Sequence, residues 1–435
     1  MRQTELFRER KMKQKIAAVF CAAILLAMLC TACQSKELPD TYVEGSDYQY
    51  MQLESKRFFM KQSQGSKGLY VLHGNYIYFL DESSDTILPL CNKADCLHDK
   101  ETDPEKYSYC NACVLPDDKR PLGDTGISYC NGVLYCLDSG FTQTAHLYRI
   151  SEDGSKKEQI YQWNNCHVNE WVIHRDILYY VKQTYEKNDE GVKEVQRLMS
   201  LSLTDPAREE KTVFVPDENL TVNTLGRPSA YGNHIYFVIH AFTPAEEEIT
   251  DDNYLEYLYN KTFVYNILTE DIQELVVPDM TPTAYVAGVT FWEEKILLSA
   301  FDQGTDETDS CDWYIEELDG SNPEIFMKDI PKYTKFTSDR TYLYLTNAYA
   351  VARGSAERDA LMYEVYNKDL EKVDTFKPMT NLIFYDIFPV GTDVMYLPYS
   401  NPDEDNPYWG VVRWDKKIGT YQGDPIDKDI VDIPG

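Results

Sequence analysis

The stretches "GLYVLHGNYIYFLD" (residues 68–81) and "ISYCNGVLYCLD" (residues 127–138) decide the fold of this chain of 435 residues. Each contains two short runs of apolar and aromatic residues, and a turn rich in Gly and Asn separates them. Alternating strand-forming runs around such a turn are typical of a β-hairpin. Five further units of this kind follow along the chain, at residues 171–182, 229–240, 289–302, 337–347 and 386–399.

A tyrosine recurs at the same place in these units, about 44 to 61 residues after the previous one. The series is Tyr78, Tyr135, Tyr179, Tyr236, Tyr344 and Tyr396, with Leu297 in place of a tyrosine in the fifth unit. One four-stranded propeller blade needs roughly 40 to 50 residues. An isolated sheet of that size cannot bury both faces, whereas radially stacked sheets can. The repeat therefore predicts an all-β fold, a β-propeller over 56–422, with the tyrosines packed between blades. We expect seven blades, and six or eight also fit the repeat.

The turn in the second unit makes a sharper prediction. Asn131–Gly132 favours a two-residue turn, which pairs Cys130 with Val133 and Ile127 with Cys136. Cys130 and Cys136 then lie on opposite faces of the hairpin and do not form a disulfide with each other.

The N-terminus has the features of an export signal. Residues 1–15 carry six basic side chains, and "IAAVFCAAILLAML" (16–29) is apolar and uncharged. This run is too short for a transmembrane helix of roughly 20 residues but suits a signal peptide. "LCTAC" (29–33) resembles the lipobox of bacterial lipoproteins, although Cys30 stands where Leu is usual. The resemblance implies that Cys33 is the lipidated first residue of the mature protein. A secretory signal without lipidation and an uncleaved anchor are the alternatives.

We therefore expect a lipoprotein signal peptide over 1–32, a polar tether over 33–55 and a C-terminal tail over 423–435. Palmitate-type acyl chains on Cys33 would anchor the protein in the bilayer on the extracytoplasmic side, in the cell envelope. The whole chain has a net charge of −30, and loss of the basic signal peptide brings it to about −34. A field of that sign repels phosphates, which excludes nucleic acid as a partner. The remaining expected partner is an unidentified protein or glycan ligand.

An insertion over 91–125 interrupts the β pattern. It begins with "CNKADCLHDKETDPEKYSYCNAC" (91–113), which contains Cys91, Cys96, His98, Cys110 and Cys113. The stretch is polar, so apolar burial cannot hold its shape. Three interpretations stay open. A disulfide from Cys91 or Cys96 to Cys110 closes the loop, a structural zinc binds three or four of these side chains, or the thiols are free and redox-active.

Two resemblances follow from these residues. "LYRISEDGSKKEQIY" (147–161) and "YIEELDGSNPEIF" (314–326) resemble the turn units of low-density-lipoprotein-receptor-type and TolB-like propellers. "PLCNKADCLHD" (89–99) with "CNA" (110–112) is similar to a stretch in bacterial lipoproteins of a propeller family of unknown function. The last position of that stretch is not usually Cys, which implies that Cys113 is an addition to a shared set. The family implies no activity.

Local catalytic motifs are absent from the sequence. It contains no H-E-x-x-H, no G-x-S-x-G, no P-loop and no sialidase box. We therefore predict no catalytic residue and a non-catalytic binding or interaction module. The alternatives are a propeller-supported glycan hydrolase or lyase, with catalytic groups from distant loops, and a scaffold for envelope assembly.

Overall fold

The computed structural model describes residues 38–43, 46–47 and, with gaps, 61–421. The longer gaps are 115–124, 139–142, 303–309, 348–362, 377–382 and 402–407. The chain divides into two compact units, Met1–Asp40 and Thr41–Gly435. The predicted signal peptide, the lipidation site Cys33 and the C-terminal tail lie outside the described residues. Among those that are described, no helix has both the length and the apolar character needed to cross a bilayer.

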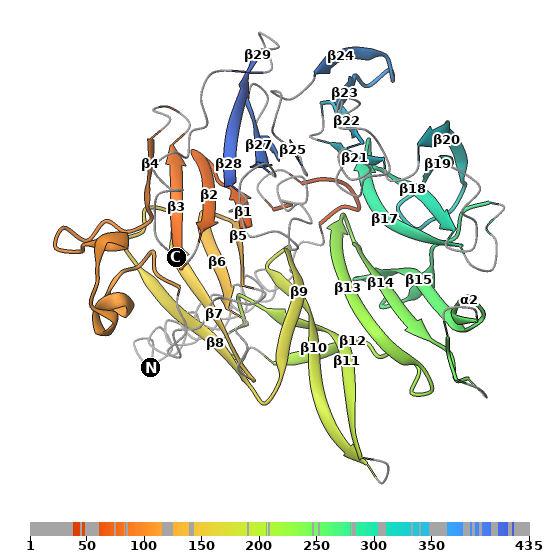
Figure 1. Ribbon diagram of the computed structural model, residues 1–435, viewed down its shortest axis with the longest axis horizontal. Helices are drawn as coiled ribbons and strands as arrows, with labels where there is room; N and C mark the ends of the chain where they lie inside the picture. Colours follow the sequence, from red (N-terminus) through yellow and green to blue (C-terminus); the bar gives the residue numbers. More distant parts are fainter. Residues whose placement is uncertain are drawn as a thin grey trace, which may run out of the picture. The chain divides into compact units, whose positions relative to one another are not determined.

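The described strands of the second unit form antiparallel sheets in chain order (Figure 1). The first sheet contains β1 (Lys61–Gln64), β2 (Gly68–His73), β3 (Tyr76–Asp81) and β4 (Thr86–Pro89). The second contains β5 (Gly126–Cys130), β6 (Val133–Asp138), β7 (Thr144–Ser151) and β8 (Lys157–Asn164). The third contains β9 (His167–His174), β10 (Ile177–Asn188), β11 (Gly191–Ser202) and β12 (Glu210–Phe214).

The later sheets repeat this plan. The fourth contains β13 (Thr221–Tyr231), β14 (His234–Phe242), β15 (Leu258–Asn266) and β16 (Ile272–Glu274), with the short helix α2 (Tyr254–Tyr257) between β14 and β15. The fifth contains β17 (Ala284–Trp292), β18 (Lys295–Asp302), β19 (Ser310–Glu316) and β20 (Glu324–Pro331). The sixth contains β21 (Lys335–Ser338), β22 (Leu343–Thr346), β23 (Tyr363–Tyr366) and β24 (Lys372–Phe376).

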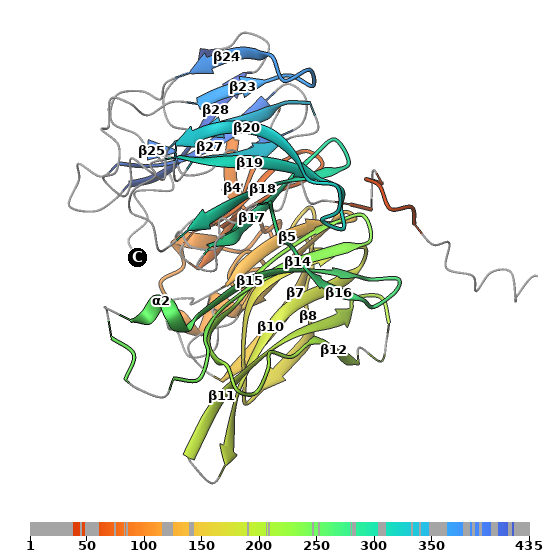
Figure 2. The same cartoon turned by 90° about the vertical axis from the view of Figure 1, so that its right-hand side faces the viewer.

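Neighbouring sheets meet through their first strands. β1 contacts β5, β5 contacts β9, β9 contacts β13, β13 contacts β17, and β17 contacts β21. The sheets accordingly stand around a common centre, and Figure 2 shows them from the side. This arrangement is a β-propeller, and the prediction of an all-β propeller is confirmed.

The expectation of seven equivalent blades was wrong. Six sheets have the regular four-stranded pattern of a blade. The last group of strands departs from it, because β25 and β26 both pair with the same neighbour, β27. Its members are β25 (Ile383–Phe384), β26 (Phe388–Val390), β27 (Val394–Asn401), β28 (Tyr408–Asp415) and β29 (Thr420–Tyr421). The sequence repeat counts hairpins, and it does not show that the strand before a hairpin is split.

The predicted register of the second sheet is confirmed. Cys130 pairs with Val133, and Ile127 pairs with Cys136. Both turn residues between β5 and β6, Asn131 and Gly132, have positive φ angles of 52° and 73°, as the tight hairpin turn requires. Cys130 and Cys136 consequently belong to different apolar clusters.

The recurring tyrosines lie between sheets, as the repeat predicted. Tyr78 packs in one apolar cluster with Leu134 of the next sheet, and Tyr135 packs with Trp171 of the sheet after that. The other described members of the series are also buried: Tyr179, Tyr236, Leu297 and Tyr344. A buried aromatic side chain removes 150–250 Å² of surface from water, so these contacts are a main source of cohesion between blades.

Residues 41–43 and 46–47 lie within the range predicted to be a tether, yet Thr41 and Asp47 bond to the propeller. Asp47 is fully buried and accepts two bonds from the Arg175 guanidinium, at 2.8 and 3.0 Å. Arg175 also donates to Asn233 Oδ1 at 2.7 Å and to the carbonyl of Thr41 at 3.1 Å. One arginine in the β9–β10 turn therefore joins the N-terminal segment to the third and fourth sheets.

Glu316, at the end of β19, is a buried acid between the fourth and fifth sheets. Its side chain is 0% exposed, and neither carboxylate oxygen has a hydrogen-bond partner among the described residues. Burial, with a smaller effect from the charge of Asp319, raises the pKa of Glu316 to about 7. Burying an unpaired charge is costly, so the group favours its neutral form.

We expect Arg175→Met to release the N-terminal segment, because Asp47 would be left charged and unpaired in the interior. Removing one partner of a buried ion pair costs about 3–5 kcal/mol. Hydrogen exchange should show that the amides of Ser46 and Asp47, which bond to the Val43 carbonyl, lose their protection. Arg197→Met, which removes a more exposed pair with Glu186 on the third sheet, is the control. Unchanged protection in Arg175→Met would contradict the role given to this ion pair.

We expect Glu316→Gln to stabilise the propeller at alkaline pH. The folded-state pKa of about 7 lies above the unfolded value of about 4.3, so ionisation costs stability as pH rises between these values. The full penalty, on the order of 3 kcal/mol, is reached above pH 7. The melting temperatures of Glu316→Gln and wild type should be alike near pH 4 and should diverge as the pH rises toward 8. Glu317→Gln, beside it on the surface and paired with Lys295, should show no such divergence.

Candidate metal centre

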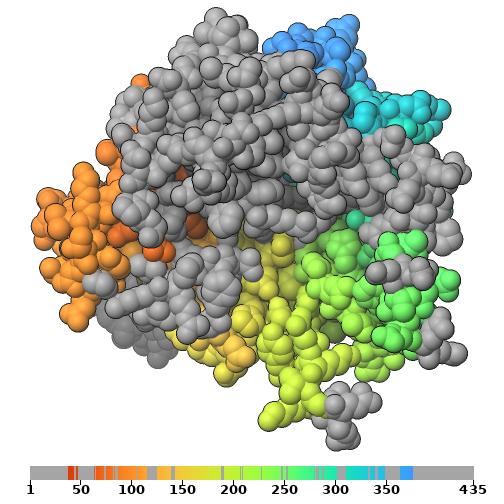
Figure 3. Space-filling view, viewed as in Figure 1, coloured from red at the N-terminus to blue at the C-terminus, as the bar shows by residue number. Residues whose placement is uncertain are grey.

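The Cys/His-rich stretch follows β4, and both of its ends bond to the neighbouring strand β3. Leu90 donates its N–H to the Ile77 carbonyl at 2.8 Å, and Ile77 in turn donates to Ala112 at 2.9 Å. Cys113 then forms an isolated bridge with Tyr76. Both ends of the loop 90–112 therefore lie on the outer edge of β3. The loop forms the orange lobe at the left of Figures 1 and 3.

The loop contains little regular structure. Its two short 3-10 helices are η3 (His98–Lys100) and η4 (Pro104–Tyr109). Asp103 starts η4, since its side chain accepts a bond from the Glu105 N–H and Pro104 follows it at the first helical position. Several large side chains on or beside the loop face solvent, among them Leu97 and Tyr109. The ends of the loop pack into the apolar cluster of the first and second sheets, but none of the described residues of 92–109 is buried.

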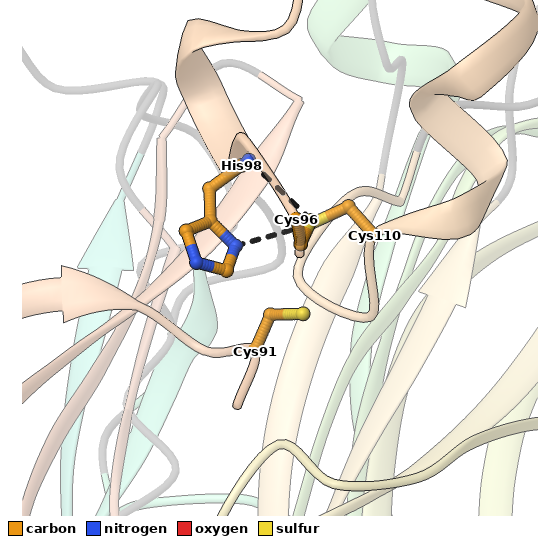
Figure 4. Close-up of side chains that lie close together, drawn as sticks. All are labelled: Cys91, Cys96, His98 and Cys110. Carbon is orange, nitrogen blue, oxygen red and sulfur yellow. Dashed lines mark hydrogen bonds between the residues drawn. The ribbon is translucent and has the colours of Figure 1, made fainter. Parts of the chain in front are cut away.

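Four of the five predicted side chains meet at the base of this loop (Figure 4). The sulfurs of Cys91, Cys96 and Cys110 and a ring nitrogen of His98 all lie within 4.8 Å of one another. The Cys110 sulfur is 3.8 Å from His98 Nδ1, and the His98 N–H donates to the Cys96 sulfur at 3.4 Å. Cys91 and Cys110 are buried, whereas Cys96 and His98 are half-buried. His98 has a left-handed backbone, with φ 55°.

The fifth predicted residue, Cys113, is not part of the cluster. It is 2% exposed and packs in the apolar cluster between the first and second sheets. No disulfide joins any of the eight described cysteines, from Cys91 to Cys311. Three of the other four, Cys130, Cys136 and Cys166, also lie in buried positions between sheets.

The thiols of the cluster differ in their environments. Burial raises the pKa of Cys110. Burial acts in the same direction on Cys91, but backbone N–H groups of Lys93 and Asn111 and the neighbouring thiols outweigh it, so the pKa of Cys91 is lowered. Hydrogen bonds to sulfur stabilise the thiolate.

Two neighbours that the sequence did not single out hold the loop against the second sheet. Lys157, on β8, donates to the carbonyls of Cys110 and Cys113, at 3.2 and 2.5 Å. Asn111 donates to the Gly154 carbonyl at 2.8 Å. Nothing in their sequence positions relates them to a loop some 45 residues away, so only the packing of the two sheets shows these roles.

Three sulfurs and one imidazole nitrogen suit a borderline-soft cation such as Zn²⁺. Four protein ligands fill a tetrahedral coordination shell and leave no position for water or substrate. Such a donor set supports structure, whereas a catalytic zinc keeps one position open. A zinc ion held by all four groups would have no open position for hydrolysis.

Comparison with known proteins identifies the fold and no family. No family model and no curated protein matches the chain. Among solved structures, a puromycin-hydrolysing peptidase from Mycobacterium tuberculosis is similar with a TM-score of 0.52 and 11% identity, over 92% of this chain and 57% of that one. A prolyl endopeptidase is similar with a TM-score of 0.51 and 11% identity, over 84% and 50%. A putative TolB from Agrobacterium tumefaciens has a TM-score of 0.34 and 9% identity, over 62% and 80%.

These comparisons correct one expectation from the sequence. The chain spans about half the length of the two peptidases that it matches. The same propeller fold is thus part of hydrolytic enzymes, so a propeller without local catalytic motifs does not indicate a non-catalytic binding module. That prediction was wrong, and the hydrolase alternative fits the comparisons better.

We expect Lys157→Met to loosen the end of the loop, because the carbonyls of Cys110 and Cys113 lose a charged donor. Hydrogen bonds to charged groups contribute about 1.5–3 kcal/mol, so exchange of the amides in 110–114 should become about 10- to 100-fold faster. Hydrogen-exchange mass spectrometry measures this directly. The control is Lys156→Met, because this neighbouring lysine pairs only with Glu158 on the surface. Equal exchange in the two variants would rule out the contact with Lys157 as a support of the loop.

Proposed function

We propose that this chain is an exported, lipid-anchored β-propeller that takes part in peptide hydrolysis at the cell envelope. The observation that carries the proposal is the likeness of nearly the whole chain to about half of a puromycin-hydrolysing peptidase and of a prolyl endopeptidase. Prolyl endopeptidases rely on inter-domain dynamics for catalysis and specificity. We assign the propeller a matching role, in which it selects the peptides that reach a catalytic site.

The bond-breaking groups belong to a partner polypeptide in this proposal. The sequence contains no G-x-S-x-G elbow and no H-E-x-x-H motif. With four protein ligands, the candidate metal centre would leave no open coordination position. About half of each similar peptidase has no counterpart in this chain, which is the portion that a partner would supply.

The net charge of the chain restricts which peptides we propose as substrates. A net charge of −30 attracts cationic peptides and repels anionic ones, and the effect weakens as salt is added. We therefore propose basic and neutral peptides as substrates. Attachment through acylated Cys33, the lipidation site implied by "LCTAC" (29–33), keeps the propeller at the membrane surface.

We expect cell envelopes with this protein to cleave a set of peptides that envelopes without it leave intact. A mixed peptide library, analysed by mass spectrometry after incubation with each preparation, measures the difference. Basic and neutral peptides should dominate the set, and high salt should reduce their cleavage. The wild-type gene restored to deletion cells is the control. Identical cleavage by both preparations would refute the hydrolytic role.

The anchor has its own test. Cys33→Ala should abolish incorporation of a palmitate analogue and shift the protein out of the membrane fraction or leave it unprocessed, because no acylated cysteine remains. Cys21→Ala, in the apolar run 16–29 before the lipobox, serves as the matched control and should still be labelled. Unchanged labelling of Cys33→Ala would refute lipidation at this residue.

A further inference from the structure

We infer that Cys91, Cys96, His98 and Cys110 bind one Zn²⁺ in a closed, structural site that holds the loop 90–112 against the first and second sheets. This inference goes beyond the proposed role in hydrolysis and does not depend on it. The argument rests on the distances in the cluster, the hydrogen bonds to its sulfurs, the charge beside it and the lack of an apolar core in the loop.

The distances are close to those of a filled site. With Zn–S bonds of about 2.3 Å and a Zn–N bond of about 2.0 Å, tetrahedral geometry places the ligand atoms about 3.5–3.8 Å apart. The His98 Nδ1 to Cys110 Sγ distance is already 3.8 Å, and all four donor atoms lie within 4.8 Å of one another. A contraction of about 1 Å or less in the longest distances completes the coordination shell.

Backbone N–H groups lie around the sulfurs of the cluster. The His98 N–H donates to the Cys96 sulfur at 3.4 Å. Backbone N–H groups of Lys93 and Asn111 act to lower the pKa of Cys91, and those of Ala112 and Cys113 act in the same direction on Cys110, whose pKa burial raises. Such outer N–H groups are what metal-bound thiolates usually have around them.

The charge of the proposed site has a counterion in place. Three thiolates and one Zn²⁺ carry a net charge of −1 with a neutral histidine. The Lys157 ammonium lies on the carbonyls of Cys110 and Cys113, and it forms no ion pair with a carboxylate among the residues that the structure describes. A half-buried cation on these carbonyls compensates the excess negative charge of the site.

A disulfide explains the cluster less well. One bond between any two of the three cysteines leaves the third sulfur and His98 without a role. A disulfide with Cys113 would draw that residue away from its bridge with Tyr76 and from its place in the apolar cluster. The zinc site uses all four converging groups and leaves Cys113 where it is.

Zinc binding supplies the cross-link that the loop needs, because its sequence contains too few apolar residues to hold its centre in place. Both ends of the loop are fixed on β3, but its centre is polar and partly exposed. One ion joins the start of the loop at Cys91, the first short helix at His98 and the end of the second at Cys110. Bonds to a structural zinc stabilise folded loops that cannot bury enough apolar surface on their own.

The first experiment measures zinc in the full-length protein purified from the envelope and passed through a chelating resin. We expect one equivalent per chain in wild type, and less than about a tenth of that in Cys96→Ser and in Cys110→Ser, which remove a ligand. Cys113→Ser is the matched control, because it removes a nearby buried cysteine outside the cluster, and it should keep its zinc. Loss of zinc in Cys113→Ser equal to that in Cys110→Ser, or no zinc in wild type, would overturn the inference.

The second experiment identifies the ligands without relying on variants that fail to fold. Wild-type protein freed of metal under reducing conditions and reloaded with Co²⁺ should show the visible bands of tetrahedral cobalt and a sulfur-to-cobalt charge-transfer band. Added Zn²⁺ should remove both, because zinc binds such sites more tightly. Octahedral cobalt bands without sulfur charge transfer would refute the assignment. So would unreduced peptide mapping that shows a disulfide among Cys91, Cys96 and Cys110.

Both experiments leave the hydrolytic proposal untouched. Zinc can be absent while envelope cleavage of peptides depends on the chain, or present while cleavage does not. Hydrogen exchange tests the structural role of the ion. Removal of zinc from wild type by a chelator should speed exchange across 90–112, while the strands β9–β16 keep their protection. Uniform loosening of the whole propeller, or no change in the loop, would argue against a site that acts on this loop alone.

Discussion

The fold depends on one constraint, which is that a four-stranded antiparallel sheet exposes two faces and can hide them only against other sheets. Each blade here carries apolar side chains on both faces, so that Cys130 and Cys136 of a single hairpin belong to two different apolar clusters. The buried tyrosines fill the space between neighbouring blades. Stability therefore arises between blades, while the hydrogen bonds within each blade set the register.

The same constraint explains why polar groups need specific contacts at positions where the apolar faces of the blades do not pack against each other. Asp47 enters the interior because the Arg175 guanidinium, which also donates to Asn233 Oδ1, pairs with it. Glu316 has no such partner among the described residues, and the pKa of its carboxyl is raised instead. The loop after β4 packs its ends into an apolar cluster but buries none of the described residues in its middle, and it gathers three sulfurs and an imidazole at its base. The ion pair, the raised pKa and the Cys/His cluster are three different ways in which polar groups are accommodated beside the apolar core.

Propellers are rigid scaffolds whose activity depends on what is attached to them. The likeness to peptidases at 11% identity establishes the fold, and the same fold is part of those hydrolytic enzymes. Absence of a local motif is weak evidence in such a fold. Catalytic groups can come from separate loops or from a partner, and neither origin leaves a signature of fixed spacing in the sequence.

Local features of this protein were determined by the sequence alone. The turn Asn131–Gly132 and the alternation around it specify the pairing of Cys130 with Val133, because only certain residues adopt positive φ at low cost. The spacing of the tyrosines specifies a propeller, because the same local pattern of strands and turns is repeated along the chain. Tertiary structure decided the rest. It brought Lys157 to the Cys/His cluster, paired Asp47 with Arg175 and split the strand before β27. Each of these depends on how distant segments meet when sheets stack, and sequence spacing carries no record of that distance.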